Sequence, residues 1–201
     1  MVNILSLIDT INDIDTSLFL YINSGHNNWL DPIMLQLSYN YYLMLSLFLF
    51  LSFLGFKYFK KQYFIMAIFI IISFALSDSI STRLFKKNFK RLRPCHQEQL
   101  KSISYLAGKK CGGGKYGFLS SHASNSFAIS MFFWMLFRKK SKIFSVLFFY
   151  SFMVSYSRVY LARHFPMDVI CGAILGLSIS YLLFVFYKKF VINNSQVLKQ
   201  L

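Results

Sequence analysis

Long apolar runs without a charged side chain dominate the hydropathy pattern of this chain. They extend over residues 33–56, 62–77, 116–137, 143–157 and 169–187. A helix needs about 20 mostly apolar residues to cross the roughly 30 Å of hydrocarbon in a bilayer. The pattern therefore predicts an all-α, polytopic membrane helix bundle with five transmembrane helices, at about residues 37–56, 62–81, 120–138, 142–161 and 167–187.

The fourth apolar run, residues 143–157, is too short to cross a membrane by itself. At about 1.5 Å per residue it reaches only roughly 22 Å. The helix is therefore expected to continue past Arg158, which places this side chain near the membrane boundary. An arginine at that depth needs a partner or a functional reason.

The N-terminal segment has a different pattern, because isoleucine and leucine recur at helical spacing between Ile4 and Ile22. This spacing predicts an amphipathic helix that lies on the membrane surface. We therefore expect one integral-membrane domain with three parts. These are an interfacial helix within residues 1–30, a five-span catalytic core over residues 37–187 and a basic cytoplasmic tail over residues 188–201.

The composition agrees with a membrane protein. The chain is 56% hydrophobic and 14% charged, whereas a soluble domain has about a quarter of charged residues. An ordinary soluble globular protein is therefore disfavoured. The net charge of +15 fits nucleic acid, an anionic membrane surface or a phosphate-bearing substrate, and the apolar runs favour the last two over nucleic acid.

The basic residues also predict the orientation. If the spans alternate, the connections at 57–61 and 138–142 lie on the same side as the C-terminal tail, and these segments carry basic but no acidic residues. Lysine and arginine in short loops mark the cytoplasmic side. The opposite side, with the N-terminal helix, the 82–119 segment and the 161–166 turn, is therefore predicted to be extracytoplasmic.

Three polar clusters occur at helix ends on this extracytoplasmic side. They are residues 86–94, residues 120–122, and a third group made of Ser157, Arg158, His164 and Asp168. Each cluster alone has a simpler interpretation: a lipid-headgroup anchor, a helix-cap histidine, or a first-turn acid next to a helix dipole. Together they lie at span ends on one face, where they can form one pocket.

The chemistry of the three clusters is complementary. Lys86, Arg93 and Arg158 supply positive charge that suits phosphate oxygens. Ser120 and the first backbone N–H groups of the third span form a helix N-terminus, which attracts anions. The two histidines permit nucleophilic attack and acid catalysis near neutral pH, and Asp168 can orient one imidazole.

A stripe of small residues follows Asp168 at four-residue steps, at Gly172, Gly176 and Ser180. Small residues at this spacing let membrane helices approach closely. The stripe therefore predicts close helix packing and directs Asp168 into the bundle.

These clusters resemble the three signatures of the type-2 phosphatidic acid phosphatase superfamily, which also includes the vanadium haloperoxidases. Lys86 to Arg93-Pro94 matches the first signature, Lys, six residues, Arg-Pro. The second signature is Pro-Ser-Gly-His, and here Leu119 and Ser121 replace its Pro and Gly. The third signature, Ser-Arg, five residues, His, three residues, Asp, matches in full over residues 157–168.

The resemblance implies a role for each matching residue. His164 would attack phosphorus and form a phosphohistidine, Asp168 would orient His164, and His122 would protonate the leaving oxygen. The phosphate-binding residues would be Lys86, Arg93, Ser120, Ser121 and Arg158. Ser121 can bring its N–H close to phosphate only if its backbone conformation is an ordinary one. The resemblance implies neither a metal nor a cofactor.

The function implied is hydrolysis of a lipid phosphate or diphosphate embedded in the bacterial cytoplasmic (inner) membrane, with the active site facing the extracytoplasmic side. Undecaprenyl diphosphate is the preferred substrate, because an outward-facing site suits lipid-carrier recycling. Lipid A, phosphatidylglycerophosphate and phosphatidate remain alternatives, as does a non-enzymatic transporter or lipid-binding protein. A haloperoxidase is disfavoured because those relatives are soluble. The oligomeric state is left open.

Two cysteines, Cys95 and Cys111, lie on the predicted extracytoplasmic loop. A disulfide between them fits an oxidising compartment. Two free thiols fit the sequence equally well, since sequence cannot give the Cα separation.

Overall fold

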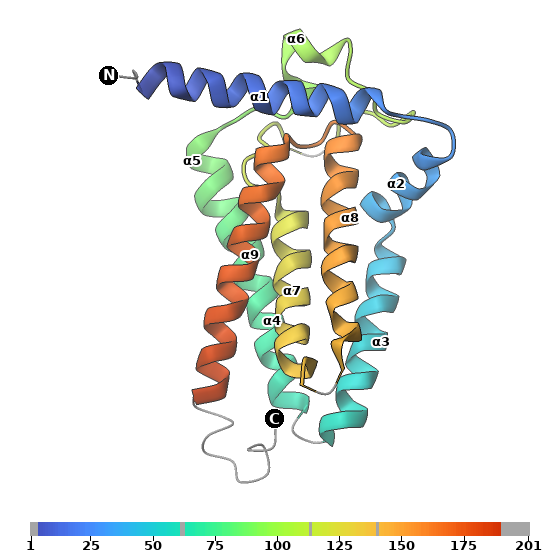
Figure 1. Ribbon diagram of the computed structural model, residues 1–201, viewed down its shortest axis with the longest axis vertical. Helices are drawn as coiled ribbons and strands as arrows, with labels where there is room; N and C mark the ends of the chain where they lie inside the picture. Colours follow the sequence, from blue (N-terminus) through green and yellow to red (C-terminus); the bar gives the residue numbers. More distant parts are fainter. Residues whose placement is uncertain (1–3, 61–62, 113, 140, 190–201) are drawn as a thin grey trace.

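The computed structural model describes residues 4–60, 63–112, 114–139 and 141–189. Over these residues the protein is an all-helical bundle, as predicted, and an isolated antiparallel bridge joins Leu92 to Tyr116. Figure 1 shows the long helices running side by side, with one helix lying across an end of the bundle.

The bundle consists of five long helices. They are α3 (Tyr41–Phe59), α4 (Tyr63–Ser79), α7 (Ser121–Phe137), α8 (Val146–Tyr160) and α9 (Pro166–Tyr187). The crossing helix is α1 (Ile4–Ser24), and α2 (Leu30–Tyr39) connects it to α3 (Figure 1). The remaining short helices are η2 (Ile80–Lys86), α5 (Lys87–Phe89), η3 (Pro94–His96), α6 (Glu98–Lys101) and η4 (Lys142–Ser145).

Two helix boundaries differ from the prediction. The helix expected to begin near residue 37 begins at Tyr41, because Asn40 has an extended backbone that separates α2 from α3. The helix expected to end at residue 81 continues from α4 through η2, a π-helical segment, into α5. Lys86 therefore lies within this long helix and not after it. At this same end of the bundle, α8 passes Arg158, as predicted, and ends at Tyr160.

Among the described residues, three helical stretches are long and apolar enough to cross a membrane: Tyr63–Phe89, Lys142–Tyr160 and Pro166–Tyr187. The bundle surface exposes many large apolar side chains, including Phe53 on α3 and Leu182 on α9. Contiguous apolar surface of this kind is rare on soluble monomers. The chain is therefore a multi-pass membrane protein, and the number of five spans remains a prediction.

The contact between α7 and α9 is very close because glycine lines it. A Cβ atom on Gly176 would lie 2.0 Å from the carbonyl oxygen of Ser124, and one on Gly172 would lie 2.7 Å from that of Ser120. Both glycines and Ser180 are buried. The predicted small-residue stripe is thus confirmed, and it fixes the start of α9 against the start of α7.

Away from the polar clusters, aromatic residues fill the interior between α4, α7 and α9. Phe132, Phe133, Phe137 and Tyr187 are fully buried there. Between helices in a membrane, such rings stabilise the bundle by van der Waals packing and not by transfer out of water. This core gives the helices fixed positions relative to one another.

Helix α1 lies across the end of the bundle that carries the polar clusters (Figure 1). Phe19 packs against Phe165 with ring centroids 5.5 Å apart, and the Asn23 side-chain amide donates to the carbonyl of Tyr160 at 2.7 Å. Another side of α1 exposes Ile14 and Leu18. This exposed apolar stripe suits the predicted interfacial location. Most of the predicted basic tail, from residue 190 on, lies outside the described residues.

Candidate active site

The first cluster reaches the bundle end through a short strand-like pairing of residues 91–93 with residues 115–117. The N–H of Arg93 donates to the carbonyl of Lys115 at 3.0 Å, and the N–H of Gly117 donates to the carbonyl of Arg91 at 2.8 Å. This pairing brings the segment after α5 beside the segment that leads into α7.

The second and third clusters meet where α7 and α9 begin. The N–H of Ser120, the residue before α7, donates to the carbonyl of Asp168 in the first turn of α9 at 3.0 Å. The side-chain oxygen of Ser120 is buried and has no hydrogen-bond partner among the described residues. A buried hydroxyl normally has a partner, so this oxygen marks a place where a polar ligand fits.

His164 and Asp168 form the centre of the site. Nδ1 of His164 lies 3.5 Å from Oδ2 of Asp168, and both side chains are buried. The same carboxylate oxygen accepts the N–H of Phe165 at 3.0 Å, which fixes Asp168 as an N-terminal cap of α9. Because Nδ1 faces the carboxylate, Nε2 is the imidazole nitrogen that remains for chemistry.

The electrostatic environment keeps His164 neutral. Burial, together with the positive charges of Arg93, Arg158 and Lys86, lowers the pKa of the His164 imidazole well below its ordinary value. A neutral imidazole is the form that can act as a nucleophile.

The three predicted phosphate-binding cations are held by polar groups on separate elements. Nζ of Lys86 donates to Oγ of Ser121 at 2.7 Å. Arg93 donates from Nε to the carbonyl of Tyr116 at 3.2 Å. Arg158 is buried and donates from Nη1 to the carbonyl of Ser38 at 3.2 Å and to the Ser38 hydroxyl.

His122 is the second residue of α7 and is partly exposed. It is close enough to Arg158, Lys86 and Arg93 to interact with their charges. Ser121, where the family signature has glycine, is the first residue of α7 and has an ordinary helical backbone. The eight predicted site residues thus come together at one end of the bundle.

Several residues around the site were not predicted from the sequence. The guanidinium of Arg91 contacts Asp168, and Gly117 leaves room for the His164–Asp168 pair. Arg163 is buried and donates to the carbonyl of Lys110 at 2.8 Å, to the carbonyl of Gly112 and to the hydroxyl of Tyr39. Its position next to His164 in the sequence was the one available signal.

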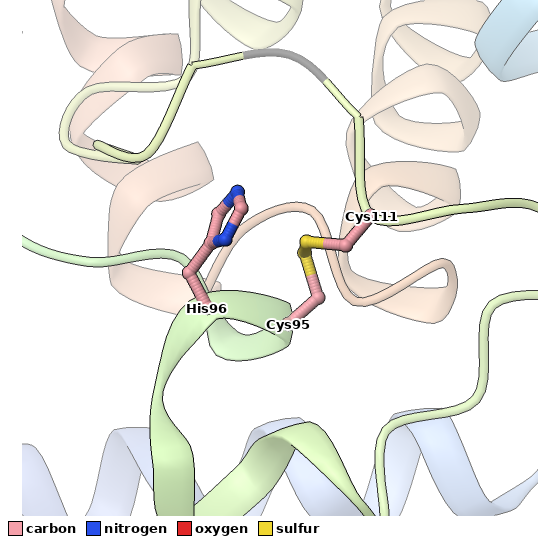
Figure 2. Close-up of side chains that lie close together, drawn as sticks. All are labelled: Cys95, His96 and Cys111. Atoms are coloured by element: carbon pink, nitrogen blue, oxygen red, sulfur yellow. A yellow bond between two sulfur atoms is a disulfide. The ribbon is translucent and has the colours of Figure 1, made fainter.

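The loop over the site is closed by a disulfide between Cys95 and Cys111, with a Cα separation of 5.8 Å (Figure 2). His96 lies beside the two sulfurs, and the three side chains are near enough to resemble a metal-ligand cluster. The sulfurs are bonded to each other, however, and the thiolate is the form of cysteine that binds metals. The disulfide adjoins Gly112, whose carbonyl accepts a hydrogen bond from Nη1 of Arg93 at 3.3 Å.

Comparison with known proteins identifies the family of this chain. The family model of the PAP2 superfamily matches residues 62–192. A lipid A 4′-phosphatase from Bacteroides thetaiotaomicron is 34% identical over 174 residues, which cover 85% of this chain and 75% of that protein. A lipid A 4′-phosphatase from Porphyromonas gingivalis is 29% identical over 178 residues, which cover 88% of this chain and 74% of that protein.

Two crystal structures share the fold. One is a transmembrane PAP2-type phosphatidylglycerolphosphate phosphatase from Bacillus subtilis, with a TM-score of 0.70 and 20% identity over 90% of this chain and 88% of that chain. The other is Aquifex aeolicus LpxE, with a TM-score of 0.60 and 23% identity over 85% of this chain and 94% of that chain. On the family match and the helical membrane architecture, this chain is a membrane phosphatase that belongs to the PAP2 superfamily.

Proposed function

We propose that this chain hydrolyses a phosphate monoester of a lipid A-type glycolipid through a phosphohistidine intermediate. The similarity to two lipid A 4′-phosphatases supports the substrate class. The observation that carries the chemistry is the buried His164–Asp168 pair beside Lys86, Arg93 and Arg158. Undecaprenyl diphosphate, which the sequence alone favoured, becomes the second candidate because both relatives are lipid A phosphatases by name.

In the first step, Nε2 of His164 forms a bond to phosphorus while the bond between phosphorus and the ester oxygen breaks. Asp168 holds the Nδ1–H side of the ring and stabilises the positive charge that develops on it. His122 gives a proton to the departing oxygen, which leaves as the hydroxyl of the lipid.

In the second step, water attacks the phosphorus of the phosphohistidine. His122, now neutral, takes a proton from this water, and the bond from His164 to phosphorus breaks. Inorganic phosphate leaves, and both histidines return to their starting protonation states.

The cations supply most of the catalytic effect in this mechanism. Negative charge spreads over the equatorial oxygens in the transition state of phosphoryl transfer, so fixed donors stabilise it. Lys86, Arg93 and Arg158 are each held by hydrogen bonds before substrate arrives. Losing one such preorganised donor costs about 100- to 1,000-fold in kcat, which is the expected loss for Arg93→Ala.

The site lies at one end of the bundle, beneath α1, so a phosphate head can enter it while the acyl chains stay in the bilayer. We place this end on the extracytoplasmic side of the inner membrane, because the basic connections lie at the other end. The tests of this orientation are Ile103→Cys and Lys139→Cys, made one at a time in a Cys171→Ala background. Membrane-impermeant thiol reagent should label only the first position in intact cells, and labelling of position 139 would invert the orientation.

The substrate proposal is tested with purified protein in detergent. Lipid A, undecaprenyl diphosphate, phosphatidylglycerophosphate and phosphatidate are supplied in parallel, and inorganic phosphate release is measured with mass spectrometry of the lipid product. We expect the highest kcat/KM with lipid A, and no phosphate release by His164→Ala with any substrate. Arg83→Ala is the matched control, because Arg83 is an exposed cation on η2. A preference for undecaprenyl diphosphate would replace the substrate and keep the mechanism, whereas turnover by His164→Ala would reject the mechanism.

A further inference from the structure

Arg91 lies between two buried carboxylates from opposite ends of the sequence. Its Nη2 lies 2.6 Å from Oδ2 of Asp15 on α1, and its Nη1 lies 2.8 Å from Oδ1 of Asp168 on α9. The Asp15 and Asp168 side chains are 1% and 0% exposed, whereas that of Arg91 is 22% exposed. The guanidinium also stacks over the ring of Phe165, 4.3 Å from its centroid.

The two oxygens of Asp168 have different partners. Oδ2 faces His164 and accepts the N–H of Phe165, whereas Oδ1 accepts the hydrogen bond from Arg91. A carboxylate held at both oxygens cannot rotate without breaking a charge-assisted hydrogen bond. Arg91 therefore fixes the plane of the group that orients the imidazole.

Asp15 in turn fixes Arg91 and the first turn of α9. Its Oδ2 pairs with Arg91, and its Oδ1 accepts the N–H of Met167 at 2.8 Å. A buried charge that loses its partner is strongly destabilising, so both contacts are maintained together. Helix α1 is thus connected to α9 next to Asp168, although α1 lies outside the residues 62–192 that match the family.

We propose that Arg91 is a positioning residue for the phosphatase reaction, and that Asp15 acts through it to couple α1 to Asp168. The proposal rests on the roles of His164 and Asp168 given above. Arg91 is not a phosphate ligand here, because its two terminal nitrogens are each engaged by a carboxylate. Its removal should therefore slow the chemical step and leave substrate binding unchanged.

The test compares Arg91→Ala, Arg91→Lys, Asp15→Asn and the double variant Arg91→Ala/Asp15→Asn with wild type and with the matched control Arg83→Ala. Each protein is purified in detergent and supplied with lipid A and, separately, with short-chain phosphatidate. Steady-state kcat and KM are measured, together with the rate of phosphohistidine formation in a single turnover of radiolabelled substrate. Thermal melting in the same detergent reports folding.

We expect Arg91→Ala to lower kcat and the rate of phosphohistidine formation by about 10- to 100-fold, by analogy with the groups that orient the ligands of metal sites. KM should stay within about three-fold of the wild-type value, because Arg91 is not expected to contact the bound substrate. Arg91→Lys should keep part of kcat, because lysine retains the positive charge. The loss should remain partial because an ammonium is a point charge that cannot bridge both carboxylates as a guanidinium does. Asp15→Asn should lower kcat less than Arg91→Ala does, and the double variant should lose little more than Arg91→Ala alone.

A structural brace without a positioning role would lower the melting temperature and leave kcat and the rate of phosphohistidine formation at wild-type values. That result in a folded Arg91→Ala protein would overturn the proposal. If Arg91→Ala does not fold, Arg91→Lys and Asp15→Asn decide, and wild-type kcat in both would overturn it equally. Turnover by His164→Ala would instead show that the underlying mechanism has failed.

Discussion

Gly117 provides a direct test of the geometry around the catalytic pair. A Cβ atom at this position would lie 2.9 Å from Oδ2 of Asp168, 3.2 Å from Cγ of Arg93 and 3.5 Å from Nδ1 of His164. Non-bonded heavy atoms are most stable about 3.5 Å or more apart. The substitution Gly117→Ala therefore requires the carboxylate of Asp168 to move by roughly half an ångström.

The contacts of Asp168 on both sides restrict this movement of its carboxylate. The His164–Asp168 contact is already 3.5 Å long, and the opposite oxygen of Asp168 is fixed by Arg91. Misplacing a reacting group by about 1 Å can cost 100-fold in rate. For a movement of half an ångström we expect Gly117→Ala to lower kcat by roughly 10-fold, because the imidazole loses its alignment while its chemical identity is unchanged.

The assay is phosphate release in detergent, with thermal melting as the measure of folding. Gly114→Ala is the matched control, because it lies in the same loop and a Cβ there would meet nothing within 4 Å. The control should keep wild-type kcat. Wild-type kcat in a folded Gly117→Ala protein would refute the reasoning, since it would mean that the carboxylate can move without consequence.

Three further predictions concern charge, packing and the loop. The ring of His164 should stay neutral as the pH falls just below 6.5, which NMR can follow once its signal is identified by its loss in His164→Gln. The free energy of unfolding should fall over the same range, because the unfolded chain gains a proton that the folded protein does not bind. Titration of the folded ring at pH 6.5 would contradict this. Gly176→Ala should destabilise the protein by about 3 kcal/mol in chemical denaturation, because its Cβ would overlap the backbone of Ser124. Gly25→Ala should be nearly neutral, because the nearest neighbour of its Cβ would be 3.5 Å away. Equal stability of the two variants would exclude close α7–α9 packing. Cys95→Ser should cost about 3 kcal/mol through loop entropy, and an unchanged denaturation midpoint would argue against the disulfide.

The sequence predicted the bundle because apolar runs of membrane length carry a strong signal. It failed at the end of the second predicted span because charged residues were taken as its limit. Arg83 and Lys86 both lie within the continued helix η2. Long basic side chains can extend their charge toward a polar region from such a position, so a charge does not end a helix.

The site was predicted as far as its residues follow fixed spacings in the chain. Arg91 and Asp15 follow none, because the partners of Arg91 are 76 and 77 residues away. Asp15 had no predicted role, because the helical pattern of the N-terminal segment does not show that its carboxylate is buried against Arg91 and Met167. Gly117 gave no signal either, because its function depends on neighbours from two other segments, Arg93 and the His164–Asp168 pair.

Arg93 and Arg158 are buried next to helix ends and loops, where free carbonyl groups are available. Each buried guanidinium needs acceptors for several N–H donors, and carbonyl groups inside a helix are already paired. Arg158 uses the carbonyl of Ser38 in the last turn of α2, whereas Arg93 uses the loop carbonyls of Tyr116 and Gly112. The irregular loop is therefore a source of acceptors that permits positive charge to accumulate at one point. Since Gly112 follows directly after Cys111, the disulfide that closes this loop also fixes one of the acceptors on which the phosphate-binding charge depends.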